Sequence, residues 1–122
     1  MIKTAFGNMV FNVGWKTKTI IKLFNIEYEI TVKLKAVSEQ QAITEEQNKV
    51  CEMFCENKTS ILQKVENMLK SYGNEENFVP TTLLIKRNGD YAILFDDKQD
   101  IENGIAVCLA PSVEILMQDQ YL

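Results

Sequence analysis

The chain has 122 residues, of which 46% are hydrophobic and 25% are charged, and these values are typical of a single globular domain that folds without a structural metal or disulfide bonds. Its 17 acidic and 13 basic residues give a net charge of -4, which opposes binding to nucleic-acid phosphates or to anionic membrane surfaces. The chain has no histidine, and this excludes catalytic triads that use histidine and zinc sites built from imidazole ligands.

Three cysteines, none in a C-x-x-C pair, indicate reduced thiols rather than a disulfide framework. Cys51 and Cys55 lie one helical turn apart and Cys108 could approach them, but a structural zinc site needs a fourth ligand, so buried free cysteines are the simpler interpretation. No apolar stretch reaches the roughly 18 residues of a membrane span, and the first residues lack the apolar core of a signal peptide. We therefore expect a cytoplasmic protein.

Three strands are predicted in the first third of the chain. The third shows the clearest pattern, because apolar and polar residues alternate from Ile26 to Ala36, which indicates one buried face and one hydrated face. A tight turn at Asn25–Ile26 would join it to the second strand and pair Phe24 with Glu27. The three strands span residues 9–13, 16–24 and 26–36.

Two helices are predicted next. Thr44 and Gln47 have the spacing of a capping box, in which both side chains bond to free amides at the start of a helix. This first helix extends to about Asn57. A second helix begins near Ser60, carries an apolar stripe at helical spacing, and ends at Gly73.

Four strands are predicted after the helices, at residues 82–87, 91–96, 105–110 and 113–117. Asn88–Gly89 is a strong hairpin signal between the first two, and the wholly apolar run from Ile105 to Ala110 is typical of a strand covered on both faces. The sequence thus predicts a single α+β domain over residues 1–122, with an antiparallel curved sheet of about six or seven strands and an inserted pair of helices packed on one face (βββ-αα-ββββ).

A series of turn, cap and core motifs runs through nearly the whole chain: Phe6–Gly7, Gly14–Trp15, the hairpin from Phe24 to Glu29, Thr44 to Gln47, Asn57–Lys58, Tyr72, Pro80, Phe95–Asp96, Gly104 to Val107 and Gln118–Asp119. Taken in order, these motifs resemble a family of small uncharacterised bacterial proteins, a domain of unknown function with no assigned activity. The resemblance implies the fold and no mechanism. The chain also resembles bacterial immunity proteins, but only by analogy of size and composition.

The segment from Asp96 to Gly104 is rich in carboxylates. Asp96, Asp97, Asp100 and Glu102 could hold Mg²⁺ or Ca²⁺, because these ions prefer oxygen ligands, although the spacing does not match an EF-hand. The alternative is a solvated loop between two strands, in which Asp and Asn side chains form turn hydrogen bonds and Gly104 adopts unusual backbone angles.

Lys16, Lys18, Lys33 and Lys35 share the polar face of the predicted hairpin, where like charges opposite each other would create a basic patch. Such a patch could bind an acidic protein partner, or it could be the ordinary solvated face of a sheet. Trp15 is a candidate anchor for a partner, since tryptophan is enriched at interface hot spots, or it closes one end of the core.

Two functions follow as alternatives. The first is a non-catalytic domain that binds another protein through these lysines and Trp15, such as an inhibitor or an immunity-like factor. The second is a divalent-metal-dependent enzyme or a small-ligand binder that uses the carboxylates between Asp96 and Glu102. We expect no organic cofactor and no nucleic-acid or membrane partner, and the sequence leaves the oligomeric state open.

Overall fold

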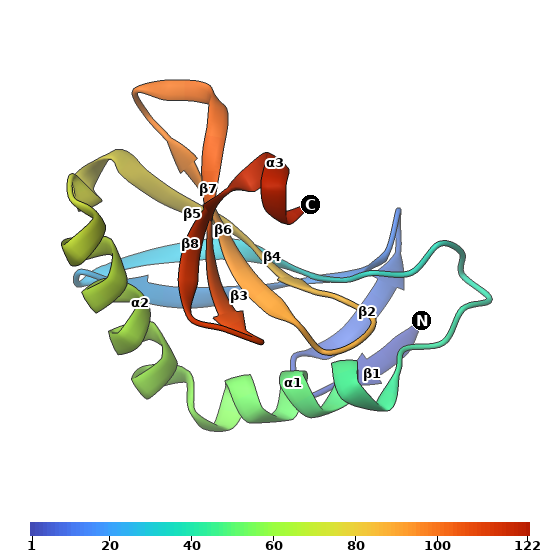
Figure 1. Cartoon of the computed structure of the whole chain (residues 1–122). Coiled ribbons are helices and arrows are strands. Elements are labelled where there is room, and N and C mark those ends of the chain that lie inside the picture. The colour runs from blue at the N-terminus through green and yellow to red at the C-terminus, as the bar shows by residue number, and fades with distance from the viewer.

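The computed structural model describes residues 1–122, and its central feature is one sheet of eight strands in which neighbours in space are also neighbours in the sequence (Figure 1). Every neighbouring pair is antiparallel except β4 and β5, which are parallel. The strands are β1 (Ile2–Thr4), β2 (Gly7–Phe11), β3 (Trp15–Leu23), β4 (Ile26–Leu34), β5 (Phe78–Ile85), β6 (Tyr91–Asp97), β7 (Asp100–Ala110) and β8 (Glu114–Met117).

The helices explain the parallel pair, because parallel neighbours need a crossover connection that brings the chain back to the same end of the sheet. That connection contains α1 (Glu45–Glu56), α2 (Lys58–Tyr72) and a short 3₁₀ turn, η1 (Glu75–Asn77). A small helix, α3 (Gln118–Tyr121), follows β8. None of these helices is both long enough and apolar enough to cross a membrane.

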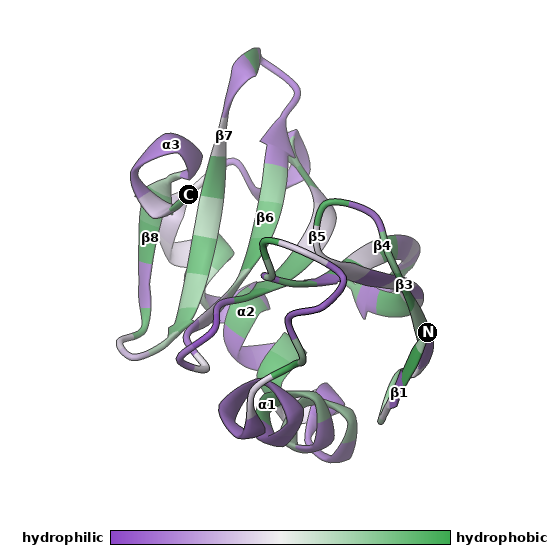
Figure 2. Ribbon diagram, turned by 90° about the vertical axis from the view of Figure 1, so that its right-hand side faces the viewer, coloured by the Kyte–Doolittle hydropathy of each residue, from purple (hydrophilic) through white to green (hydrophobic).

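The two sides of the sheet are covered by different elements. The side packed against α1 and α2, here called the helix face, carries the main core of 21 buried residues, among them Val32, Phe54 and Ile93. The opposite side, the outer face, has a smaller buried cluster of six residues where Tyr121 of α3 packs on β5, β6 and β7. Figure 2 shows β6 and β7 as mainly hydrophobic strands, as expected for strands covered on both faces. The outer faces of β3 and β4 lie outside this cluster.

The predicted fold class is confirmed in its coarse form, a mixed fold with a mostly antiparallel sheet and an inserted pair of helices. The strand count was too low, because β1 has three residues and is too short to show a periodic pattern. The expectation of a wholly antiparallel sheet was wrong for β4 and β5. Alternation of apolar residues reports which face of a strand is buried, and it carries no information on strand direction.

The turn of the β3–β4 hairpin lies one residue earlier than predicted. Phe24 and Asn25 form it with φ values of 50° and 63°, as a type I′ turn requires, and Leu23 pairs with Ile26. A positive φ is costly for phenylalanine. The Phe24 N–H donates to Glu66 Oε2 of α2 at 3.1 Å, so a contact with the helix stabilises a turn that the local sequence does not favour.

Gln47 fastens the start of α1 to the end of the parallel pair. The predicted capping box is confirmed: the Gln47 N–H donates to Thr44 Oγ1, and the Thr44 N–H donates to Gln47 Oε1, each over 3.0 Å. The Gln47 side chain is fully buried, and its Nε2 donates to the carbonyl oxygens of Lys35 at 3.0 Å and Ile85 at 3.3 Å. Because these two carbonyls stand where β4 and β5 end, one side chain caps a helix and joins two strands.

We expect Gln47→Met to lower the free energy of unfolding by about 1–3 kcal/mol, because methionine fills the same volume but leaves the part-buried Lys35 carbonyl and Thr44 N–H without a partner. Urea unfolding measures the change. Gln63→Met, on the exposed side of α2, is the matched control and should change stability by less than about 0.5 kcal/mol. Equal effects of the two substitutions would contradict the role assigned to Gln47.

Candidate functional site

The outer face of the β3–β4 hairpin carries a row of lysines. Lys16 and Lys33 are direct cross-strand partners, Lys18 follows Lys16 at alternate spacing, and Lys35 follows Lys33 in the same way. The residues between them, such as Val32, are buried in the core on the helix face. Alternation along the two strands therefore puts all four lysines on one side of the sheet, as the sequence pattern predicted.

Three of these lysines line a shallow hollow of about 340 Å³ that extends across β4 to β5 and β6. Threonine hydroxyls and leucine side chains complete it, so the hollow combines positive charge, hydrogen-bonding groups and apolar surface. Its lining consists of Lys16, Thr31, Lys33, Lys35, Thr82, Leu84, Leu94 and Leu122. We call this surface the lysine hollow.

The positive charges of the lysine hollow are not neutralised within the chain. Lys18, at its margin, pairs with Glu29 at 3.6 Å, but no carboxylate lies within 4.0 Å of Lys16, Lys33 or Lys35. Burial lowers the pKa of Lys33, and the charges of Lys16 and Lys35 lower it further. The folded protein therefore holds Lys33 in a position where its charge is disfavoured, and an anionic group in the hollow would relieve that cost.

Sequence reasoning missed part of this surface. Lys86, directly after β5, is a further lysine that does not line the hollow: its Nζ lies 4.0 Å from the centre of the Tyr121 ring and donates to the Tyr121 carbonyl oxygen at 2.7 Å. Thr82 and Leu94 reach the hollow from β5 and β6. The alternate spacing of Thr82, Leu84 and Lys86 in the sequence indicates that they share one face of β5. It does not predict that β5 lies beside β4 in a parallel pair.

Trp15 does not belong to an exposed surface. It begins β3, its side chain is 3% exposed, and its Nε1 donates to the carbonyl oxygen of Gln41 at 3.1 Å. The Phe11 ring packs edge-on against it, with ring centroids 5.5 Å apart. The proposal that Trp15 anchors a partner is therefore corrected: it closes one end of the core, and its single polar group is satisfied inside the protein.

The four carboxylates predicted as a metal site lie on a hairpin rather than on a loop. β6 ends at Asp97 and β7 begins at Asp100, and these two residues pair across the turn. The hydrophilic tip of the hairpin projects beyond the rest of the sheet (Figures 1 and 2). Asp96, Asp100 and Glu102 are exposed, and no group of three His, Cys, Asp or Glu side chains is placed to hold a metal ion. A metal site at this tip is an expectation from the sequence alone, and ion titration is the measurement that tests it.

The polar side chains of this hairpin tip make the hydrogen bonds of a turn. Asp97 Oδ1 accepts the Gln99 N–H at 2.9 Å, and Asp100 Oδ2 accepts from Asn103 Nδ2 at 3.2 Å. Gly104 is needed for a different reason than predicted. Its φ is not positive, but a Cβ there would lie 2.2 Å from the Phe95 carbonyl oxygen, so glycine permits a close approach of two strands.

The three cysteines are free and do not form a cluster. Cys51 is buried in the core on the helix face, whereas Cys108 is buried in the cluster on the outer face. Burial raises the pKa of Cys51 to about 12, and it raises the pKa of Cys55 and Cys108 as well. The thiols are therefore protonated at neutral pH, and nucleophilic thiolates are scarce.

Comparison with known families agrees with the resemblance in the motifs. A model described as Domain of unknown function (DUF6985) matches residues 5–110. The chain belongs to this family. Within the DUF6985 match lie Lys16, Lys33, Lys35 and both threonines of the lysine hollow, while Leu122 lies beyond it. No curated protein and no solved structure matches the chain.

Replacing Lys33 with methionine should raise the free energy of unfolding at pH 7 by about 0.2–1 kcal/mol, the usual size of a cross-strand charge effect. A lowered pKa means that the folded state disfavours the charged form. The destabilisation is therefore complete below the pKa of Lys33 in the folded protein and is lost as the pH rises through it towards the ordinary value of 10.5.

Urea titrations at pH 7 and above pH 10 test this, with the advantage of Lys33→Met shrinking at the higher pH. Lys49→Met is the control, because Lys49 is exposed and pairs with Glu45 at 3.3 Å, so its removal should bring no gain. A loss of stability in the Lys33 variant at pH 7 would contradict the prediction.

Because the carboxylates at the hairpin tip do not converge, we expect the thermal midpoint to be unchanged by Mg²⁺, Ca²⁺, Mn²⁺ or Zn²⁺ at millimolar concentration. An ion that binds only the folded state must raise the midpoint as its concentration increases. A concentration-dependent rise that disappears in the double variant Asp97→Asn, Asp100→Asn would instead establish an ion site on this hairpin.

Proposed function

We propose that this DUF6985 protein is a non-catalytic domain that binds an acidic segment of another protein through the lysine hollow. The observation that supports this is the unneutralised charge of Lys16, Lys33 and Lys35 in a chain whose net charge is -4. A positive patch on an acidic protein favours encounter with a negative surface on a partner. Side chains that repel each other in the free protein gain most from an anionic partner.

The chemistry of the hollow favours a protein over a nucleic acid. Leu122, which is 60% exposed, provides apolar surface beside the lysines, and this suits a segment with both carboxylates and apolar side chains. The chain has a single arginine, Arg87, and its Nη1 donates to the Ala42 carbonyl oxygen at 2.7 Å. Arginine, the usual residue for bidentate contact with phosphate or guanine, is thus engaged elsewhere.

Several features support action by contact rather than by catalysis. The raised pKa values of the cysteines leave few nucleophilic thiolates, and the chain has no histidine to act as a general base near neutral pH. Inhibitors and immunity-like factors are proteins that work by contact alone. We also propose a cytoplasmic location, which is consistent with three free cysteines.

Affinity capture with the whole chain tests the proposal. The immobilised protein, the double variant Lys33→Glu, Lys35→Glu and the control Lys49→Glu, Lys64→Glu are exposed to extract of the cells that encode the protein. The two variants change the net charge equally, but the control changes only helix surfaces. We expect a protein that is retained by the wild type and the control, lost from the hollow variant, and released as the salt concentration rises.

The purified partner should then bind the wild type with an affinity that falls at least about tenfold in the hollow variant, since two favourable charge pairs become repulsive. If every retained protein is lost equally from both variants, or from neither, the lysine hollow is not the binding surface.

A further inference from the structure

β4 and β5 are paired over only part of their length. The parallel ladder joins Thr31–Leu34 to Thr82–Ile85, at the end that Gln47 fastens. Towards the other end, residues 26–30 of β4 pair only with β3, and residues 78–80 of β5 pair only with β6. The sheet therefore has a split between its two central strands, with a strand edge on each side.

The backbone of β4 presents unpaired hydrogen-bonding groups to this split. The Lys35 N–H donates to the Ile85 carbonyl oxygen at 3.0 Å, so the main chain of Lys35 points towards β5. Main-chain direction alternates along a strand. The N–H and C=O groups of Glu29 and Glu27, six and eight residues earlier, therefore also point to the β5 side, where they have no partner strand.

The β5 side of the split offers fewer such groups. The Phe78 N–H already donates to the Glu75 carbonyl oxygen, and Pro80 has no N–H to donate. A bulge between Pro80 and Thr82 also interrupts the register with β6. The edge of β4 is therefore the side on which an additional strand could pair.

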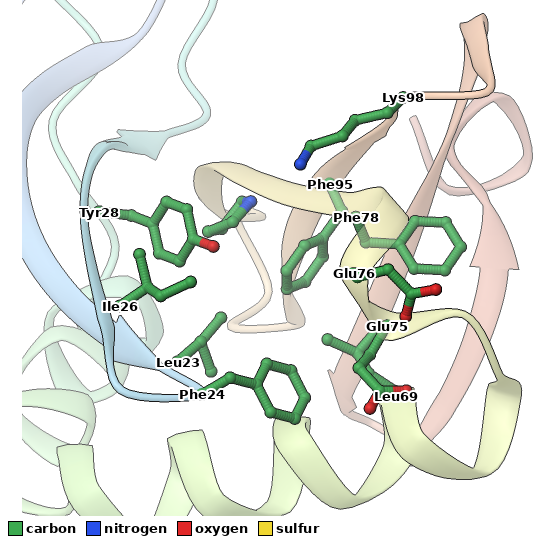
Figure 3. Close-up of a pocket in the computed structure, with 11 residues that line it drawn as sticks. Leu23, Phe24, Ile26, Tyr28, Leu69, Glu75, Glu76, Phe78, Phe95 and Lys98 are labelled. Carbon is green, nitrogen blue, oxygen red and sulfur yellow. The ribbon is translucent and has the colours of Figure 1, made fainter.

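An apolar hollow of about 290 Å³ lies at the same split, on the helix face (Figure 3). In Figure 3, Tyr28 and Ile26 of β4 face Phe78 and Phe95 of β5 and β6 across it. The Ile26 side chain is 53% exposed, which is a large fraction for isoleucine beside an apolar hollow. The full lining is Leu23, Phe24, Ile26, Tyr28, Leu69, Glu75, Glu76, Phe78, Pro80, Phe95 and Lys98.

The charges around the split are mainly negative. Glu75 and Glu76 line the hollow. The Glu27 and Glu29 side chains are exposed on the outer face of the same edge, where Glu29 also pairs with Lys18 at 3.6 Å and Glu27 lies opposite Lys22. Lys98 is the one cation in the lining. An occupant with basic side chains is therefore favoured over an acidic one.

We propose that this split binds an extended peptide segment of a partner protein, which pairs with the β4 edge and places alternate large apolar side chains in the hollow. The five residues from Ile26 to Ile30 give an edge of roughly 17 Å. Basic side chains at the intervening positions face Glu27 and Glu29. A bound strand would both pair with the free backbone groups of β4 and fill the hollow with its side chains. A compact apolar ligand would only fill the hollow. This site lies at the open end of β4, whereas the lysine hollow lies where β4 and β5 are paired, so the two sites share no lining residue.

A synthetic probe tests the proposal: a seven-residue peptide in which lysine alternates with valine or leucine, titrated into the ¹⁵N-labelled whole chain. We expect the amide resonances of Glu27 and Glu29 to shift downfield and their hydrogen exchange to slow. Ile26→Asp should weaken binding by about tenfold or more through the loss of apolar contact. Val113→Asp is the matched control, because Val113 is 51% exposed in the connection between β7 and β8, away from the β4 edge, and it should leave the affinity within about twofold.

Two N-methylated versions of the peptide provide the decisive measurement, because they keep its charge and side chains. In a strand, only one of the two alternate sets of amides faces β4. Methylation of one set should therefore abolish binding, and methylation of the other should leave it unchanged. Equal affinity of both versions would overturn the proposal, as would the absence of shifts at Glu27 and Glu29.

Protection of the same amides that grows with protein concentration, without peptide, would show that a second copy occupies the edge and would also overturn it. Lys33→Glu, Lys35→Glu should bind the probe as the wild type does. This variant therefore distinguishes a failure of the strand-binding proposal from a failure of the proposal that the lysine hollow binds a partner.

Discussion

The arrangement of the whole domain depends on the contact that the buried Gln47 side chain makes with β4 and β5. A crossover of two helices can pack on a sheet in many positions. A buried amide with specific hydrogen-bond partners excludes most of these positions. Gln47 accepts from the Thr44 N–H and donates to the Lys35 and Ile85 carbonyls, so its position fixes the start of α1 and the ends of both strands together. Arg87 adds a donor 3.4 Å from Gln47 Oε1. The parallel pair is therefore closed firmly at one end.

β4 and β5 are paired at one end and separated at the other, and in both places contacts with the helical segment hold the strands. The far end of the β3–β4 hairpin is attached to α2, because Glu66 accepts the Phe24 N–H and Lys70 lies 5.8 Å from the centre of the Phe24 ring. The start of β5 is attached to a different element, the η1 turn, through the Phe78 N–H and Glu75. The start of β4 is thus held by α2 and the start of β5 by η1, and the two strands pair only from Thr31 onward. The split between them follows from where the helices hold each strand.

Sequence patterns located most elements and faces but not their relations in space. The capping box at Thr44 and the burial of alternate residues in β4 are local properties, and both were predicted. The turn at Phe24 was not, since a contact with Glu66 far along the chain stabilises it. That error moved each cross-strand partner by two residues, so every side chain stayed on its predicted face. The lysines were therefore placed correctly, whereas the neighbours that β5 contributes required the crossover geometry. The sequence left two alternatives for Trp15, a partner anchor or closure of the core, because the residue that its side chain bonds to, Gln41, lies in a segment without periodicity.

The outward residues of β4 explain how one strand serves two surfaces of opposite charge. They run Glu27, Glu29, Thr31, Lys33 and then Lys35, so the charge changes from negative at the split end to positive at the closed end. The inward residues alternate with them and are mainly apolar along the whole strand. The outward positions are free to carry either charge because the core constrains only the inward ones. Carboxylates on an unpaired edge also discourage pairing between copies of the chain, since like charges would face each other. A one-residue shift of β4 would bury these charges and expose the core, so the same alternation that forms the two surfaces also fixes the register that stabilises them.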